Sequence, residues 1–262
     1  MAKRRDIPVQ SYGSEVGTPS VEELAAWIAG RRGRAGGDLV TYQLETSLAL
    51  QQPIADPCVG GIFYAQRLRD ALIGFREGVL KDEPGIDPRE VAADARALVA
   101  EKKGIRMAIP APHLLGLADD YIGDAEEFAE LTAELYARLM REMRDAGVWG
   151  HVLIADSADA IELENLAGRR CTFFPRDPAV FDLELLLEYQ TELPILPDQL
   201  PWAIDRTEEY SIRRLVLMHA ESGDLAAAAE YTDPERLRAG GYCEQDCAGY
   251  WQARVDEAFI LR

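Results

Sequence analysis

The 262-residue sequence predicts an α/β fold, a single (β/α)8 (TIM) barrel domain covering residues 1–262. Short apolar runs recur along the chain, helix-like stretches separate them, and reactive side chains gather where several runs end. Strands that alternate with helices indicate parallel βαβ units, and eight units can close into a barrel with its chemistry at the carboxyl ends of the strands. The expected strands are Pro8–Tyr12, Leu39–Leu44, Arg106–Pro110, His151–Ala155, Cys171–Pro175, Glu192–Leu196, Arg214–His219 and Leu237–Tyr242.

The stretches between these runs carry helix signals. Ser20 with Glu23 forms a capping-box pattern, and a later Asp-Pro pair opens another helix because proline is accepted in the first turn. An alternative interpretation is an irregular helical half up to about Val148, followed by a five-stranded open sheet. On the barrel interpretation, helices are expected near residues 20–32, 62–79, from 88 onward, 124–147, 161–166, 182–189, 201–210, 224–231 and 249–259.

The composition is that of an acidic globular protein with a formal net charge of −18. Such a surface disfavours nucleic acid and anionic membranes, because like charges repel. The first residues contain a basic patch with no apolar stretch after it, so no signal peptide is expected, and no apolar run approaches the ~18 residues that cross a bilayer. We therefore expect a cytoplasmic protein with a small-molecule partner, and the oligomeric state stays open.

The four cysteines are too widely spaced for a secreted disulfide framework, so reduced thiols are the expected state. Cys243 and Cys247 form a Cys-x3-Cys pair that could place two thiolates on one metal ion, and thiolates suit zinc. Cys171 and His219 could complete a tetrahedral site if the barrel closes. The alternative is that Cys171 and Cys58 are buried small residues and that the pair is incidental.

Polar side chains follow several of the expected strands. His219 ends the seventh strand and Glu221 follows it, and the two suit a metal ligand or an acid–base pair; His113 comes just past the third strand. Asp156 follows the fourth strand, and Glu45 ends the second. Both histidines could instead have a purely structural role. His113 would then hydrogen-bond its own loop, and His219 would be a hydrogen-bonded histidine beside Glu221 at the surface.

Arg176 follows the fifth strand and could bind a carboxylate through two parallel hydrogen bonds. The neighbouring Asp177 is better explained as a helix N-cap, because Pro178 stands at a first-turn position. The sequence contains no Gly-x-Gly-x-x-Gly, no Gly-x4-Gly-Lys-Ser/Thr and no Gly-x-Ser-x-Gly. No nucleotide cofactor is therefore predicted.

Several stretches resemble one superfamily. Gly104-Ile-Arg-Met-Ala-Ile-Pro-Ala-Pro-His, Tyr121-Ile-Gly-Asp and the long helix that ends in Ala146-Gly147 are similar to the middle of a family. That family joins cobalamin-independent methionine synthases, related zinc methyltransferases and uroporphyrinogen decarboxylase. Val9-Gln-Ser11-Tyr12 and Asp38-Leu-Val-Thr resemble its first and second strands.

The resemblance implies a barrel that transfers a methyl or other one-carbon group to a small thiol. Asp156 falls at an aspartate that would bind the amine of homocysteine, although the family's Asp-Glu-Pro is Asp-Ser-Ala here. Zinc would be held by some of Cys171, His219, Glu221 and Cys243. Substrate contacts would come from Ser11, Glu45 and Arg176, and acid–base chemistry from Asp156 and His113.

Two other classes of function stay open. One is a non-catalytic relative that binds a ligand or a partner protein. The other is a metal-free decarboxylase or lyase that acts on a polycarboxylate and would need Arg176 and further arginines at the barrel mouth.

Overall fold

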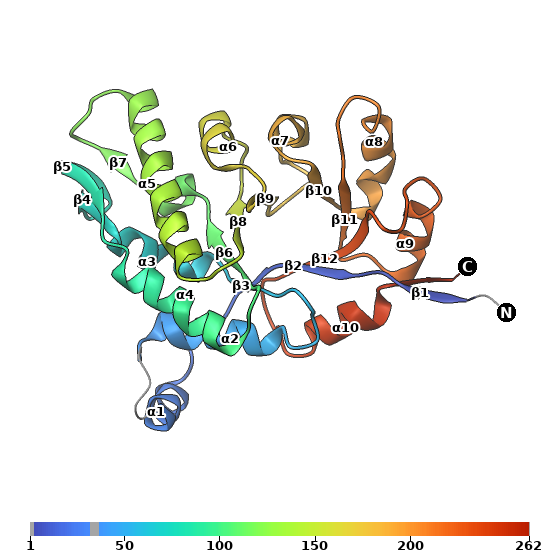
Figure 1. Cartoon of the computed structure of the whole chain (residues 1–262), viewed down its shortest axis with the longest axis horizontal. Helices are drawn as coiled ribbons and strands as arrows, with labels where there is room; N and C mark the ends of the chain where they lie inside the picture. Colours follow the sequence, from blue (N-terminus) through green and yellow to red (C-terminus); the bar gives the residue numbers. More distant parts are fainter. Residues whose placement is uncertain (1–2, 32–36, 262) are drawn as a thin grey trace.

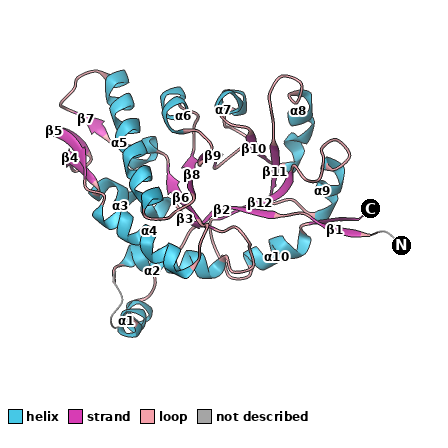
Figure 2. Cartoon of the chain, in the orientation of Figure 1, coloured by secondary structure: helices cyan, strands magenta, loops and turns pink. Residues whose placement is uncertain are grey.

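The centre of the molecule consists of eight short parallel strands. The computed structural model describes residues 3–31 and 37–261, and Figures 1 and 2 show the strands enclosed by helices. The central strands, in chain order, are β2 (Val9–Ser14), β3 (Cys58–Gly60), β6 (Arg106–Pro110), β8 (Gly150–Ala155), β9 (Cys171–Pro175), β10 (Glu192–Ile195), β11 (Arg214–Met218) and β12 (Leu237–Cys243).

Hydrogen bonding divides these strands into two four-stranded sheets, with orders β10-β11-β12-β2 and β3-β6-β8-β9. Every pairing within the two sheets is parallel. The sheets adjoin each other at both edges, because β2 contacts β3 and β9 contacts β10, although no ladder joins either pair in the described part of the chain. The result is a barrel-like α/β fold in which the parallel strands neighbour one another in chain order.

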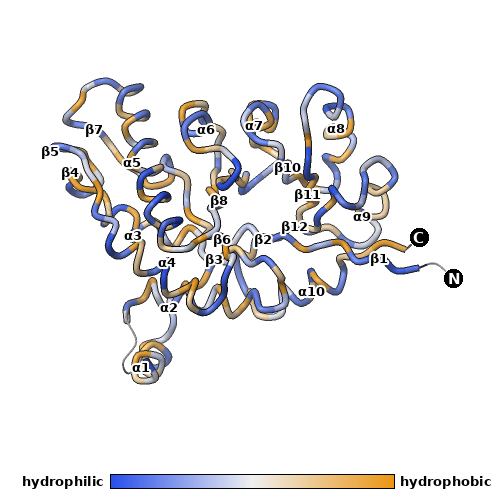
Figure 3. The backbone as a smooth tube through the Cα atoms, in the orientation of Figure 1, coloured by the Kyte–Doolittle hydropathy of each residue, from blue (hydrophilic) through white to orange (hydrophobic). Residues whose placement is uncertain are grey.

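Helices follow most of the strands and cover them from outside (Figure 1). The longest, α5, begins at Asp124, whose carboxylate accepts the backbone N–H groups of Glu126 and Glu127. Its apolar and polar residues alternate along the helix (Figure 3). The helices are α1 (Val21–Gly30), α2 (Leu39–Leu50), α3 (Ala65–Asp70), α4 (Arg89–Glu101), α5 (Ala125–Asp145), α6 (Ala160–Leu166), α7 (Leu183–Tyr189), α8 (Leu200–Asp205), α9 (Ser222–Ala228) and α10 (Tyr250–Glu257), with 3-10 turns at Ile62–Tyr64, Pro112–Leu115 and Pro197–Gln199.

The predicted second strand, Leu39–Leu44, is wrong: these residues begin helix α2. Asp38 caps this helix by accepting the N–H of Thr41 at 2.8 Å. The true second strand is the three-residue β3, and side chains of α2 bind its backbone: Gln51 bonds both the N–H and the carbonyl of Cys58, and Ser47 accepts the N–H of Gly60. The second strand is thus held on one side by a helix.

The predicted helix over residues 62–79 is also wrong. It contains only a 3-10 turn and the short α3, and the chain then forms an antiparallel hairpin of β4 (Leu72–Arg76) and β5 (Val79–Ile86). Glu77 and Gly78 both have positive φ, at 52° and 81°, as a two-residue hairpin turn requires. β5 continues the sheet to the two-residue β7 (Ala118–Asp119). The predicted end of the first helix near Arg32 lies outside the described residues.

Strand residues alternate between two apolar clusters, as the pleat of a strand dictates. One set, which includes Met107, Leu153 and Leu217, packs with the helices in the larger cluster. The other set comes from all the central strands except β10 and fills the barrel interior. Its members are Tyr12, Cys58, Ala108, Val152, Ile154, Phe174, Val216, Met218 and Tyr242.

The two ends of the described chain lie side by side. β1 (Arg4–Asp6) pairs antiparallel with β13 (Phe259–Leu261), and Figure 1 shows both termini at the same edge of the molecule. In residues 3–31 and 37–261, no helix has the length and apolar character needed to cross a membrane.

Candidate functional site at the mouth of the barrel

A pocket of ≈ 380 Å³ opens at the carboxyl ends of β9, β11 and β12, and we call it the mouth pocket. Phe174, Leu196 and Met218 provide apolar wall. The polar residues that line it are Arg176, Asp177, His219, Tyr242, Glu244, Gln245 and Tyr250. It is therefore an apolar pocket with charged groups of both signs around it. It lies at the end of the barrel where active sites are usually located.

His219 occupies this pocket in a conformation that a non-glycine residue seldom adopts. Its φ is 55°, at the point where the chain leaves β11, and its backbone N–H donates to Gly240 at 3.0 Å. Backbone strain of this kind is concentrated at functional sites. Desolvation of the ring, together with the positive charge of Arg254, lowers the pKa of His219. The imidazole is therefore neutral near pH 7.

The hydroxyl of Tyr250 determines which nitrogen of the neutral His219 ring carries the hydrogen. The hydroxyl oxygen lies 3.0 Å from Nδ1 of His219, and the backbone N–H of Tyr242 bonds the same hydroxyl. Burial raises the pKa of Tyr250 to about 12, so the hydroxyl keeps its proton and can donate it to Nδ1. We therefore assign the hydrogen of the ring to Nε2, which makes Nε2 a hydrogen-bond donor.

Arg176 and Glu244 form the charged side of the pocket. The Nε atom of Arg176 donates to Oε1 of Glu244 at 2.8 Å, and both side chains are about half exposed. This bond leaves the two Nη groups of the guanidinium for a ligand, since a guanidinium carries five donors. Arg176 thus lines the mouth pocket, and its contact with a substrate stays a prediction.

Glu15 connects the mouth pocket to the end of β3. One of its carboxylate oxygens accepts the Tyr242 hydroxyl and the backbone N–H of Ile62. A Cβ on Gly61 would stand 2.6 Å from this oxygen, so only glycine allows the carboxylate to approach so closely. Burial and the Glu15 charge raise the pKa of Tyr242 strongly, and its phenol stays protonated.

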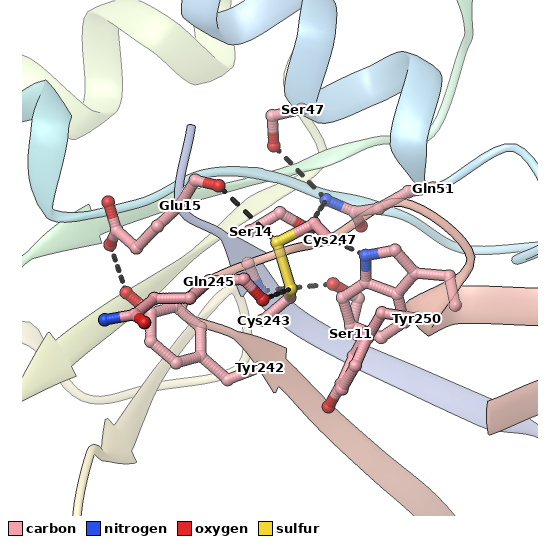
Figure 4. Close-up of a disulfide and its surroundings, with 12 residues drawn as sticks. Ser11, Ser14, Glu15, Ser47, Gln51, Tyr242, Cys243, Gln245, Cys247 and Tyr250 are labelled. Carbon is pink, nitrogen blue, oxygen red and sulfur yellow. Dashed lines mark hydrogen bonds between the residues drawn. A yellow bond between two sulfur atoms is a disulfide. The ribbon is translucent and has the colours of Figure 1, made fainter. Parts of the chain in front are cut away.

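Cys243 lies at the lip of the pocket and forms a disulfide with Cys247 (Figure 4). The expectation of reduced thiols is wrong for this pair, while Cys58 and Cys171 are free and buried. The four-residue spacing places both sulfurs at one turn, between β12 and α10, where they can meet. Figure 4 shows Glu15 and Tyr242 beside this disulfide.

The structure does not bring the predicted zinc ligands together. Cys171 begins β9 at the amino end of the barrel, where its Sγ lies 4.0 Å from the sulfur of Met140, and burial raises its pKa to about 12. Cys243 is in the disulfide, and Glu221 is an exposed residue at the start of α9. Within residues 3–31 and 37–261, no group of three His, Cys, Asp or Glu side chains could hold a metal ion. The residues present do not fit zinc.

His113 and Asp156 do meet, at the carboxyl ends of the adjacent strands β6 and β8. Nε2 of His113 lies 2.9 Å from Oδ1 of Asp156, and Nδ1 lies 2.8 Å from Oε2 of Glu162. Glu162 also accepts the backbone N–H of His113 at 2.7 Å. Burial acts to lower the pKa of His113, but the two carboxylates outweigh it and raise the pKa. Both ring nitrogens are engaged, so this group is an ion-paired clamp between the loop after β6 and helix α6.

Two further predicted residues lie away from the mouth. Glu45 is on α2, where it accepts Trp27 Nε1 at 3.0 Å and pairs with Arg31, so that it fastens α1 to α2. Ser11 is buried on the side of β2 that faces away from the barrel interior, and its hydroxyl accepts the N–H of Gly13 at 3.1 Å. Neither residue is placed to contact a ligand in the mouth pocket.

Sequence reasoning missed Glu162, Glu15, Tyr242 and Tyr250. Tyr250 could not be found from its own neighbourhood, because its contact with His219 joins residues 31 positions apart in the sequence. Tyr242 did carry a signal: it ends the predicted eighth strand, the kind of position that also pointed to Asp156.

Solved structures share this fold. A B12-independent methionine synthase from Shewanella sp. W3-18-1 in complex with selenomethionine is 13% identical, and the match covers 97% of this chain and 95% of that chain with a TM-score of 0.57. A putative vitamin-B12 independent methionine synthase from Listeria monocytogenes is 14% identical over 97% and 96% of the two chains, with a TM-score of 0.62.

No protein-family model matches the sequence, and no curated protein matches it either. The likeness to the two methionine synthase structures concerns the fold, because identities of 13% and 14% carry no assignment of residues. The chain therefore has the barrel-like α/β fold of these proteins.

Proposed function

We propose that the protein binds a small α-amino acid with an apolar or sulfur-containing side chain in the mouth pocket, and that it transfers a methyl group from a nitrogen or sulfonium donor to the thiol sulfur of such a ligand. The C–N or C–S bond of the donor breaks, the donor leaves as the demethylated amine or thioether, and the thiol gives up its proton. The proposal depends on one observation, the separation of apolar and polar side chains within the pocket. Phe174, Leu196 and Met218 form one wall, and Arg176, Glu244 and His219 provide donors and an acceptor. A zwitterion with a thioether or thiol side chain matches both parts.

The charged groups suit the two ends of an amino acid. The free Nη groups of Arg176 and the Nε2–H of His219 can donate to a carboxylate, and charge-assisted bonds of this type are the stronger ones. Glu244 can accept from the ammonium group. The volume of ≈ 380 Å³ is at the small end of the range for ligand pockets, which favours a compact molecule.

The folds of the two methionine synthases support the choice of ligand and reaction. One of those proteins was solved in complex with selenomethionine, an amino acid of the proposed kind. The transfer itself remains a proposal. It would not use the predicted zinc set, since Cys171 and Cys243 are not available as ligands here.

Calorimetric titration with L-methionine and L-homocysteine tests the binding, with D-methionine and L-alanine as comparison ligands. Arg176→Gln should weaken binding of the L-amino acids by about tenfold or more, the usual effect of losing a charged hydrogen bond. The matched control is Arg206→Gln just after α8, which removes an arginine that pairs with Glu184 outside the pocket. No saturable binding, or equal loss in both variants, would overturn the proposal.

A second candidate is a relative that binds the same ligand without chemistry. The disulfide at Cys243 and the absence of a three-ligand metal group in the described ranges favour it. Incubation of homocysteine with methyl donors that carry the group on nitrogen or on a sulfonium distinguishes the two. Formation of methionine above the background of Arg176→Gln supports transfer, and binding without turnover supports the second candidate.

A further inference from the structure

The opposite, amino-terminal opening of the barrel holds a second pocket, of ≈ 400 Å³. It is lined by the first residues of several strands and by the loops before them. Arg106 begins β6, Arg214 begins β11 and Arg238 is the second residue of β12, and all three line the pocket. We call these three side chains the arginine layer.

Strand alternation places the arginine layer inside the barrel. Arg106 is two residues before Ala108, Arg214 is two before Val216, and Arg238 is four before Tyr242. Ala108, Val216 and Tyr242 belong to the cluster that fills the interior. Since side chains two and four residues apart share one face of a strand, the three guanidinium groups lie below this cluster and face the same space.

Arg106 confirms this direction by its contact. Its Nη2 donates to the carbonyl of Ser11 at 3.0 Å, which requires the side chain to reach from β6 to β2. Barrel interiors are normally filled with layers of apolar branched residues. Three arginines at the amino-terminal end of this interior, in a chain of net charge −18, are therefore an exception that needs a physical reason.

The protein's own carboxylates do not fully balance the layer. Glu192 faces the same interior, where one of its oxygens accepts Gln10 and Tyr12 and the other accepts Arg214 Nη1 at 2.7 Å. Asp56 lines the pocket and is exposed. Three guanidinium charges thus face two carboxylates, of which Glu192 already has its own donors.

Arg238 and Arg106 both have capacity for a ligand, since each donates only to backbone carbonyls among the hydrogen bonds of the described residues. The Nη1 atom of Arg238 donates to the carbonyls of Glu235 and Leu237, and no carboxylate in residues 3–31 and 37–261 pairs with it. Burial and the nearby Arg214 lower its pKa, which agrees with an excess of positive potential at this point. Arg214 is 44% exposed, so the layer is open to solvent.

We propose that this amino-end pocket binds a compact oxyanion, a phosphate or carboxylate group of a small molecule, between Arg106, Arg214 and Arg238. Planar guanidinium groups bind such oxyanions through paired hydrogen bonds. The half-exposed indole of Trp149 lies at the edge of the same pocket and offers a flat apolar surface to the rest of the ligand. This site is separate from the mouth pocket and does not depend on its proposed function.

Calorimetry with inorganic phosphate, pyrophosphate and citrate at constant ionic strength tests the site and distinguishes the two kinds of oxyanion. We expect saturable binding of at least one anion. Arg238→Gln should weaken it about tenfold or more, because one charged partner is lost, while the fold is retained since Arg238 bonds only backbone carbonyls. Arg76→Gln on the β4–β5 hairpin is the matched control, since it removes an exposed arginine that does not line this pocket.

A second variant tests the proposal even if Arg238→Gln fails to fold. Arg214→Lys keeps the charge that faces Glu192 but loses the planar fork, so binding should weaken while thermal stability stays close to that of the wild type. Absence of saturable binding of all three anions up to about 10 mM would overturn the proposal. Unchanged affinity in both variants would overturn it as well.

Discussion

The Nδ1 atom of His113 lies 2.8 Å from Oε2 of Glu162, a carboxylate that is only 8% exposed. Because the carboxylates raise the pKa of His113 above its ordinary value, protonation of the imidazole stabilises the folded state. This contribution is fully present below about pH 6.5, the pKa of an unfolded histidine, and is lost as the pH rises through the folded pKa.

His113→Gln should therefore cost more at low pH than at high pH. We expect a loss of about 1.5–3 kcal/mol in the free energy of unfolding near pH 6, and a smaller loss near pH 9. Urea denaturation at the two pH values measures the difference. His151→Gln serves for comparison, since that histidine has no carboxylate partner among the hydrogen bonds of the described chain. A loss that is equal at both pH values for His113→Gln would contradict the ion-pair interpretation.

The three histidines of the chain should titrate in a fixed order. The pKa of His113 is raised, that of His219 is lowered, and burial together with Arg144 lowers the pKa of His151 to about 3. Proton NMR of the ring Cε1–H signals from pH 4 to 9 measures all three, with assignment by single His→Gln variants. His219 should titrate below His113, and His151 should stay neutral throughout. Titration of His219 above His113 would exclude the neutral donor assigned to the mouth pocket.

The sequence allowed the strands β6, β8 and β9 to be predicted within one residue, because each is a continuous apolar run between clear helices. β3 could not be predicted in the same way. It is only three residues long, and the groups that hold its edge are the Gln51 and Ser47 side chains of α2. A short strand supported by a helix leaves no periodic pattern of its own, and the polar residues that bind it resemble an ordinary helix surface.

The candidate site, like the fold, could be predicted from the sequence only in part. His113 and Asp156 were predicted only separately, as residues that follow the third and fourth strands, and the pairing of β6 with β8 brings them together. The contact of Tyr250 with His219 depends on how α10 packs after a turn, which local sequence does not encode. The zinc set was expected from residue type, but Cys171 stands at the beginning of its strand and so belongs to the other end of the barrel.

Two glycines should respond very differently to the same substitution. Gly60 has a φ of +117°, and a Cβ there would stand 2.3 Å from the carbonyl oxygen of Ala108 in the neighbouring strand. Gly104 also has positive φ, at +76°, but a Cβ would meet nothing within 4 Å. We expect Gly104→Ala to cost about 1–2 kcal/mol, the penalty of the left-handed conformation alone. Gly60→Ala should cost clearly more or prevent folding, because strand backbone must also move.

Thermal unfolding followed by circular dichroism measures both variants. Gly60→Ala combines two costs, since its φ lies further from the left-handed well than that of Gly104 and the added Cβ also meets the backbone of β6. Equal destabilisation by the two substitutions would show that β3 does not pack against β6 as closely as described.

The Cys243–Cys247 disulfide should contribute a modest stability and leave two thiols free. Only Cys58 and Cys171 are unpaired, so the unfolded, unreduced protein should react as two thiols and the reduced protein as four. Closing a loop of this length removes denatured-state entropy worth about 2 kcal/mol. The double variant C243S/C247S should lose about that amount and should unfold identically with and without reductant, whereas reductant should destabilise the wild type. Four reactive thiols before reduction would show that the lip of the mouth pocket is not cross-linked, and Cys243 would then be free to meet a ligand there.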